Sequence, residues 1–155
     1  MIEPLLFTST LLLGKEMFTQ TITTTTNNIY SGIDKLLKND NIEFKKICED
    51  LDIHIKLDII NTFIIDIHNS DTNSSDTNSN TIFNETINKT FKYLEDILKT
   101  IELEIENINN AILFYEKLWF RQIRKCNYTI IISNLVKHIK ILDSRFELLI
   151  KLIKI

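Results

Sequence analysis

Apolar residues recur from residue 87 to residue 119 at alternating steps of four and three. This spacing places one apolar stripe along one side of a helix. Neither Gly nor Pro interrupts the stretch, so we predict a single helix over residues 81–125, roughly 65 Å long at 1.5 Å per residue. A compact globule of this chain length is only about 40 Å across, so an elongated molecule is expected. The stripe consists of Ile87, Phe91, Leu94, Leu98, Ile101, Ile105, Ile108, Ile112, Tyr115 and Trp119.

A second stripe with the same spacing predicts a last helix over residues 129–154, about 39 Å long. Between the two predicted helices lies a short connection at Cys126 and Asn127. A short link between two helices with apolar stripes predicts an antiparallel hairpin. The stripe residues are Ile132, Leu135, Ile139, Leu142, Phe146, Leu149 and Ile153.

The first third of the chain also carries a helical pattern, over residues 5–38. The β-branched run of residues 23–26 weakens it, so two alternatives stay open: a continuous helix, or a helix broken near Asn27 and Asn28. Asp40 followed by Glu43 resembles a capping box that starts the next helix. The apolar face comprises Leu11, Phe18, Ile22, Ile29, Ile33, Leu36 and Leu37.

Residues 51–59, LDIHIKLDI, alternate strictly between apolar and polar, which is typical of a strand. No second strand is predicted to pair with them, and a lone strand leaves its backbone groups unsatisfied. A helical pattern also fits, because apolar residues step by four and three through Ile53, Leu57, Ile60, Ile64 and Ile67. We therefore predict a helix, and its wide apolar arc indicates a central place in the bundle.

Residues 69–80, NSDTNSSDTNSN, are of low complexity and contain no large apolar side chain. We predict a flexible loop there, within one domain that spans residues 1–155. The predicted fold class is all-α: an elongated bundle of four to five helices, with one very long helix and a C-terminal antiparallel hairpin.

Charge is distributed unevenly along a chain whose formal net charge is −3. Residues 1–116 carry 9 basic and 19 acidic groups, whereas residues 117–155 carry 9 basic and 2 acidic groups. In one interpretation the two parts complement each other inside the bundle. In the other, the basic C-terminal part presents a face to an anionic partner.

The most distinctive local feature is the segment 118–124, LWFRQIR, because neighbouring Trp and Arg residues are enriched at protein interfaces. Three interpretations stay open: core packing at the end of the bundle, a docking surface for a protein, and contact with an anionic membrane or nucleic acid. The candidate interaction surface consists of Trp119, Phe120, Arg121, Arg124, Lys125, Lys137 and Lys140.

No arrangement typical of an enzyme, a metal site or a cofactor site is found in the sequence, so we predict no catalytic residues, no metal and no cofactor. His54 has Asp50 and Asp58 at i−4 and i+4, which we interpret as a solvated polar face rather than a carboxylate–imidazole pair. Cys48 and Cys126 suit buried positions in a reducing compartment. With no predicted signal peptide or transmembrane segment, we expect an intracellular protein, cytoplasmic or virion-associated.

Three segments together resemble small uncharacterised helical proteins of large and giant DNA viruses: TLLLGKEMF (10–18), EDLDIHIKLDIINTFIIDI (49–67) and KHIKILDSRFELLIKLI (137–153). The resemblance implies a virion-associated or accessory protein. We expect a non-enzymatic structural or interaction protein that binds a protein partner or associates with itself as a homodimer. The alternative is a peripheral binder of anionic membrane or nucleic acid through the basic C-terminal hairpin.

Overall fold

The computed structural model describes residues 4–38, 42–72, 85–117 and 129–154, and places the side chains of these segments except those of residues 4–15 and 71–72. Every regular element in the described segments is a helix, as predicted. The helices are α1 (Pro4–Lys38), α2 (Ile42–Asp50), α3 (Ile53–Thr72), α4 (Glu85–Glu116) and α5 (Thr129–Ile153).

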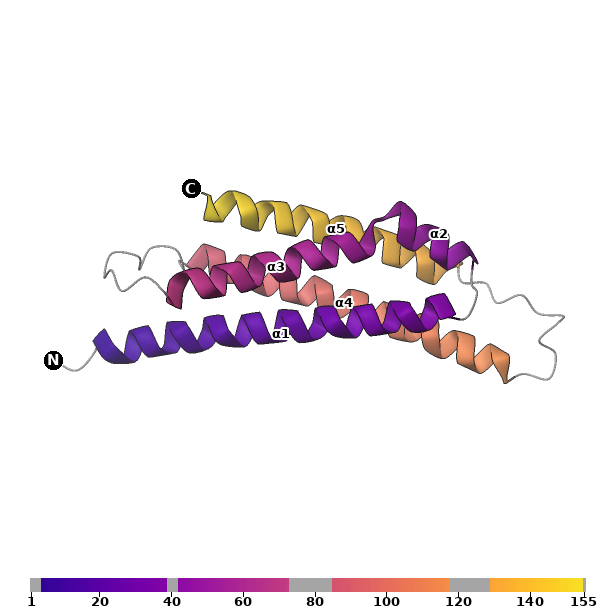
Figure 1. Ribbon diagram of the computed structural model, residues 1–155, viewed down its shortest axis with the longest axis horizontal. Helices are drawn as coiled ribbons and strands as arrows, with labels where there is room; N and C mark the ends of the chain where they lie inside the picture. The colour runs from indigo at the N-terminus through magenta and orange to yellow at the C-terminus, as the bar shows by residue number, and fades with distance from the viewer. Residues whose placement is uncertain (1–3, 39–41, 73–84, 118–128, 155) are drawn as a thin grey trace.

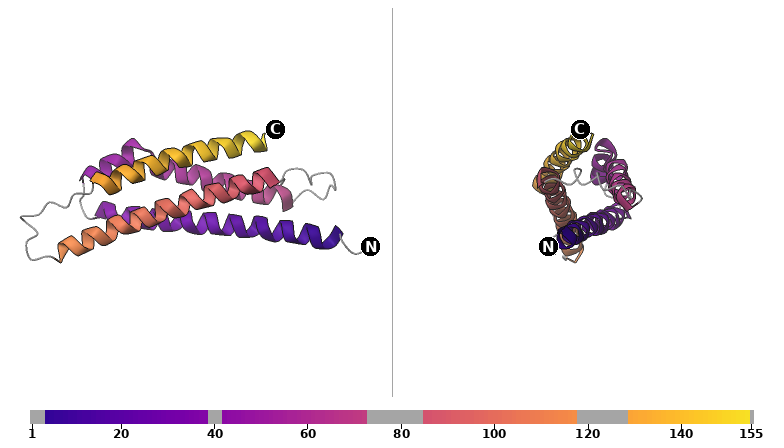
Figure 2. Two further views of the ribbon diagram at one scale, coloured as in Figure 1. Left: turned by 180° about the vertical axis from the view of Figure 1, so that it is seen from behind. Right: turned by 90° about the vertical axis from the view of Figure 1, so that its left-hand side faces the viewer.

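The four longer helices lie side by side in an elongated bundle (Figure 1). Seen from its end, the bundle has α1, α4, α5 and α3 at its four corners, with α2 beside one end of α3 (Figure 2). α1 and α4 run in one direction along the bundle, and α3 and α5 run in the opposite direction. The antiparallel packing of α4 against α5 confirms the predicted C-terminal hairpin.

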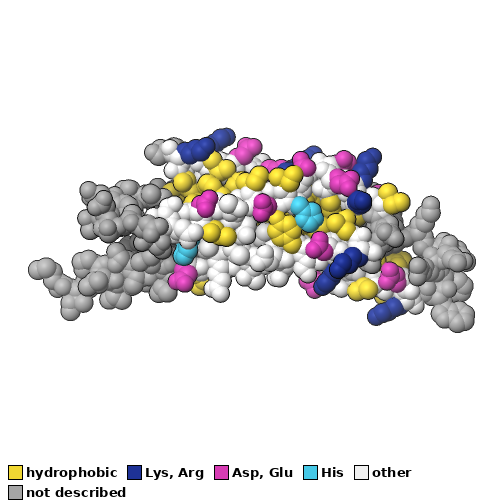
Figure 3. All heavy atoms as spheres, viewed as in Figure 1, with side chains coloured by type: hydrophobic (Ala, Val, Ile, Leu, Met, Phe, Trp, Pro, Cys, Tyr) yellow, Lys and Arg dark blue, Asp and Glu magenta, His cyan; other side chains and the backbone are white. Residues whose placement is uncertain are grey.

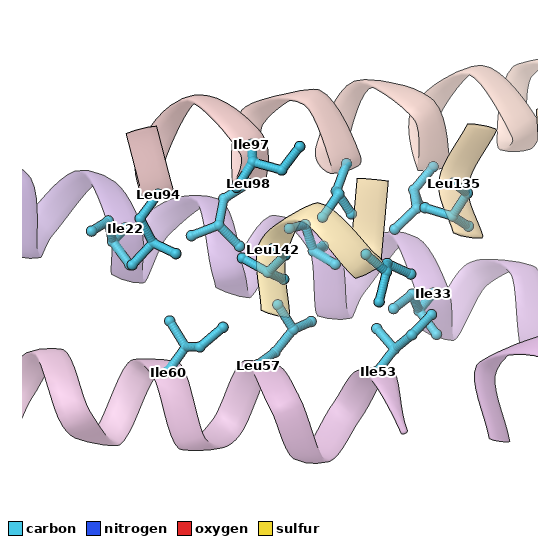
Figure 4. Packing of buried hydrophobic residues seen from close by; sticks show 14 of the residues in the cluster. Ile22, Ile33, Ile53, Leu57, Ile60, Leu94, Ile97, Leu98, Leu135 and Leu142 are labelled. Atoms are coloured by element: carbon cyan, nitrogen blue, oxygen red, sulfur yellow. The ribbon is translucent and has the colours of Figure 1, made fainter. Parts of the chain in front are cut away.

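The interior of the bundle is filled almost entirely by Ile and Leu side chains from all four long helices (Figure 4). The apolar stripe of α4 is buried from Ile87 to Ile112, and Tyr115 is half-buried. In α5 the predicted stripe residues are buried except Phe146 and Ile153, which pack against the core from its edge. The periodicity therefore identified the inward sides of both helices.

The ends of the long helix differ from the prediction. α4 has 32 residues, about 48 Å at 1.5 Å per residue, and ends at Glu116 rather than at residue 125. The predicted connection at Cys126 and Asn127 lies outside the described residues. Leu113 and Phe114 near the end of α4 are 50% and 62% exposed, so the last turn of this helix gains little from apolar burial. α1, with 35 residues, is the longer helix.

The predicted helix over residues 5–38 is confirmed, and of the two alternatives it is the continuous one, because α1 passes through Asn27 and Asn28 without a break. Thr25 and Thr26 of the β-branched run are buried, and the side chain of Asn28 donates a hydrogen bond to Glu102 of α4, 2.7 Å away. Packing against neighbouring helices therefore outweighs the weak helix propensity of this segment.

The segment that alternates like a strand is helical, as predicted, but a turn at Leu51 and Asp52 separates α2 from α3. Asp52 has a φ of 49°, in the left-handed region that Asp tolerates better than most residues. At its other end α3 continues to Thr72, so the first four residues of the predicted flexible loop, 69–72, are helical. The rest of that loop lies outside the described residues.

Cys48 of α2 is buried in the core. Burial, with a smaller contribution from the charge of Glu49, raises the pKa of its thiol to about 12. Since the thiolate is the reactive form, Cys48 in a Cys126→Ser background should react with a disulfide reagent at pH 8 at least ~100-fold more slowly in the folded than in the unfolded protein. Measuring the reaction rate with and without denaturant tests this, and equal rates would contradict it.

Candidate interaction surface

Most of the predicted interaction surface lies outside the described residues, namely Trp119, Phe120, Arg121, Arg124 and Lys125. The other two predicted residues, Lys137 and Lys140, are exposed on α5. Neither forms an ion pair with another described residue.

Lys137 and Lys140 line a shallow depression of about 670 Å³ on α5. Its other described lining residues are Ser133, Val136, Ile141, Ser144, Arg145 and Leu148. The guanidinium of Arg145 is held against α4. It donates a hydrogen bond to the carbonyl oxygen of Tyr93, and its Cζ atom lies 5.8 Å from the centre of the Tyr93 ring. The lysines are therefore the freely projecting cations of this depression.

α3 and α5 meet along one side of the bundle through two side-chain contacts. The Nζ atom of Lys56 lies 2.7 Å from Oδ2 of Asp143, and the rings of Phe63 and Phe146 meet edge to face with centroids 5.4 Å apart. Ile59 stands between Lys56 and Phe63 at helical spacings of three and four, so it lies on the edge of α3 next to α5. Ile59 is nevertheless 51% exposed, and Ile55, one turn earlier, is 59% exposed.

A band of hydrophobic side chains is visible between α3 and α5 on the surface of the bundle (Figure 3). We call this side the α3–α5 face. It comprises Asp52, Ile55, Ile59, Phe63 and Asp66 from α3 and the residue before it, and Lys140, Phe146, Glu147 and Lys151 from α5. The face therefore combines exposed isoleucines and half-buried aromatic rings with charges.

The two helices contribute different charges to the α3–α5 face. Asp52 and Asp66 are exposed, and each is seven residues from Ile59, so both lie on its strip of α3. On α5, Lys140 lies one turn before Asp143, and the exposed Glu147 and Lys151 follow Lys140 on the same strip at spacings of seven and eleven residues. The α3 half of the face is therefore acidic, and the α5 half carries charges of both signs.

The sequence contained a signal for this face that the prediction of a central helix missed. Apolar residues at every second position of a helix point about 200° apart, so they form two strips rather than one. Ile53 and Leu57 are buried, whereas Ile55 and Ile59 lie outside. The wide apolar arc of α3 therefore reflects one core strip and one exposed strip, and α3 occupies a corner of the bundle rather than its centre.

A second depression, of about 620 Å³, lies between α1 and α4 around Gly32. There the Asn109 side chain donates hydrogen bonds to the carbonyl oxygens of Gly32, at 3.1 Å, and Ile105, at 3.2 Å. The Asn28–Glu102 hydrogen bond closes the same region. The side-chain amides of Asn28 and Asn109 therefore connect α1 and α4 through hydrogen bonds.

His54 and His138 take part in contacts between helices. The Tyr30 hydroxyl donates a hydrogen bond of 2.8 Å to the carbonyl oxygen of His54, and the two rings lie 5.3 Å apart. Burial, with a smaller effect from Asp58, raises the pKa of Tyr30. Asp50 belongs to α2 and not to the helix of His54, so the predicted i−4 relation is interrupted by the turn. Nδ1 of His138 in α5 lies 2.8 Å from Oε1 of Glu104 in α4.

Among the residues whose placement is described, no three His, Cys, Asp or Glu side chains are arranged to hold a metal ion. No helix of the described segments has the length and apolarity needed to cross a bilayer. No protein-family model, curated protein or solved structure matches the chain.

Proposed function

We propose that this protein is a non-enzymatic helical protein that binds another protein through the α3–α5 face. The observation that carries the proposal is the pair of exposed isoleucines, Ile55 and Ile59, beside the half-buried rings of Phe63 and Phe146. Adjacent exposed apolar side chains rimmed by charges are typical of protein interaction sites. A virion-associated or accessory role, which the sequence resemblance implies, belongs to the same proposal.

Site-specific photo-crosslinking tests this proposal. A photoreactive amino acid at position 59 should give protein adducts in cell extract or in the purified protein, because this position lies inside the proposed interface. The matched control is position 103 of α4, where Leu103 is similarly exposed, at 55%, but lies away from the α3–α5 face. Equal adduct yields at the two positions, or none at position 59, would contradict the proposal.

A second candidate function is binding to an anionic membrane or nucleic acid, which the exposed Lys137 and Lys140 favour. Such binding releases counterions and therefore weakens steeply as salt rises. The protein-interaction proposal predicts no binding to acidic lipid vesicles or duplex DNA at about 0.15 M salt. Co-sedimentation with vesicles and a DNA mobility shift, each repeated with Lys137→Glu/Lys140→Glu, test this. Binding that the double substitution abolishes would favour the second candidate.

A further inference from the structure

The interface between α1 and α3 contains buried polar groups without a partner. Tyr30 contacts His54 through its hydroxyl and its ring, so the strips of α1 and α3 that carry these two residues face each other. Thr26 lies one turn before Tyr30 on its strip, and Asn61 lies two turns after His54 on the other. Oγ1 of Thr26 and Oδ1 of Asn61 are buried, and neither has a hydrogen-bond partner among the described residues. Because α1 and α3 run in opposite directions, the two residues lie within about one turn of each other along the bundle.

A buried polar atom that has lost its hydrogen bonds to water without gaining new ones destabilises the folded form. Thr26 is 0% exposed, so its hydroxyl has no access to solvent. Nδ1 of His68, seven residues after Asn61 on the same strip of α3, is also buried without a partner in the described segments. Separation of α3 from α1 would return all three groups to water and would recover this free energy.

Among the long helices, α3 packs least closely against its neighbours. The backbone of α4 lies close to those of α1 and α5, whereas the backbone of α3 approaches α1 at fewer places and α5 at fewer still. Side-chain contacts between α3 and α5 include Lys56 with Asp143, both partly exposed, and Phe63 with Phe146 at the edge of the core. A partly exposed ion pair adds little to stability. α3 is therefore the long helix whose release disturbs the rest of the bundle least.

α2 belongs with α3, because it lies beside one end of that helix (Figure 2). Its buried Phe44 and Cys48 join the same core as Ile53 and Leu57 of α3. Burial of these apolar side chains keeps the closed bundle strongly favoured, so any opening is a rare event. Proteins nevertheless open locally in cooperative units, at a lower free energy than global unfolding requires.

We propose that α2 and α3 separate as one unit from α1, α4 and α5, and that this opening is a conformational device that exposes the apolar interior of the bundle. The other three helices stay packed together, since α4 lies along both α1 and α5. The close approach of α1 and α4 at Gly32 and the contact of His138 with Glu104 between α5 and α4 persist in the opened form. This opening needs no partner, so it does not depend on the proposed function.

Hydrogen exchange of backbone amides in the native full-length chain tests the opening. It is followed by NMR at rising urea concentrations below the unfolding transition. The amides of Ile60 and Ile64 in α3 should show protection factors at least tenfold lower than the amide of Ile105 in α4. The thiol of Cys48, in the Cys126→Ser chain, should react with a disulfide reagent through the same opening and give the same opening constant as the α3 amides. Protection as high in α3 as in α4 would overturn the proposal.

Gly32→Ala distinguishes this opening from unfolding of the whole chain. A Cβ atom at residue 32 would lie 2.6 Å from Cγ2 of Ile105, at a contact between α1 and α4 that the opened form keeps. The substitution should therefore lower the protection of α4 amides at least fivefold and leave the α3 amides and Cys48 within twofold of the wild type. Ile105→Val, which shortens the side chain at the same contact, is the second variant. If α3 and α4 amides change by the same factor in either variant, the two helices open only together and the proposed unit does not exist.

Thr26→Val tests the physical cause, because it replaces a hydroxyl that has no partner by a methyl group of nearly the same size. The protection of α3 amides should rise at least fivefold, since the closed form no longer buries an unpaired polar group. Thr90→Val in α4 is the matched control. Thr90 is similarly buried, at 4% exposed, but its hydroxyl donates a hydrogen bond of 2.8 Å to the carbonyl oxygen of Thr86, so its replacement should not raise the protection of any amide. Unchanged α3 protection in Thr26→Val, or an equal rise in both variants, would reject the role given to the unpaired groups and with it the proposal.

Discussion

Ile105→Asp should unfold the protein or lower its stability by about 4 kcal/mol or more. Ile105 is only 1% exposed and lies in the middle of the buried stripe of α4, opposite Gly32 of α1. A carboxylate at this position would be removed from water without a partner, and the packing of a large apolar side chain would be lost as well. For a chain of this size the expected fall in melting temperature exceeds about 8 °C.

The neighbouring substitution Leu103→Asp provides the matched control, because the change is the same and the helix is the same. Leu103 is 55% exposed, so its replacement should cost no more than about 1 kcal/mol, mostly through the lower helix propensity of Asp. Thermal unfolding followed by circular dichroism measures both variants. Melting temperatures that fall by the same amount in the two variants would show that the α4 stripe does not form the core.

The inward sides of the helices could be predicted because burial follows the helical period so closely. Ile53, Leu57, Ile60 and Ile64 were assigned to one strip from their spacing alone, and all four are buried. The strand-like alternation of residues 51–59 did not lead to a wrong prediction. Every second apolar residue of this segment, Ile53 and Leu57, also fits the spacing of one strip of a helix. The remaining apolar residues, Ile55 and Ile59, required knowledge of which neighbours surround α3.

Helix ends and junctions were predicted less well, since they depend on contacts that the local sequence does not encode. The turn that separates α2 from α3 relies on the left-handed backbone of Asp52, whose side-chain type permits this conformation without requiring it. The continuity of α1 through Asn28 depends on Glu102, 74 residues away. A propensity argument cannot include a partner so distant in the chain.

The candidate site was predicted only in part, for a related reason. The sequence analysis chose clustered aromatic and basic residues, of which Lys137 and Lys140 are exposed in the described segments. The acidic half of the α3–α5 face, Asp52 and Asp66, was not singled out. Its position beside α5 is a property of the tertiary packing, which the contacts Lys56–Asp143 and Phe63–Phe146 reveal.

Gly32→Ala should destabilise the protein by about 1–3 kcal/mol, although alanine is the better helix former by about 1 kcal/mol. A Cβ atom at residue 32 would lie 2.6 Å from Cγ2 of Ile105, well inside van der Waals contact. Relief requires α1 and α4 to move apart, which would also stretch the 3.1 Å hydrogen bond from Asn109 to the Gly32 carbonyl oxygen. The close approach of these helices therefore depends on the missing side chain.

A double-mutant cycle with Ile105→Ala identifies the clash as the cause, since this substitution removes Cγ2. Ile105→Ala alone should cost about 2–5 kcal/mol, and its cost should be smaller by roughly 1 kcal/mol or more when Gly32→Ala is already present. Ser31→Ala, at the exposed neighbouring position of α1, should change stability by no more than about 0.5 kcal/mol. Urea unfolding of the four chains of the cycle measures the coupling. A Gly32→Ala protein more stable than the wild type would show that helix propensity, and not the contact with Ile105, decides the choice of residue at this crossing.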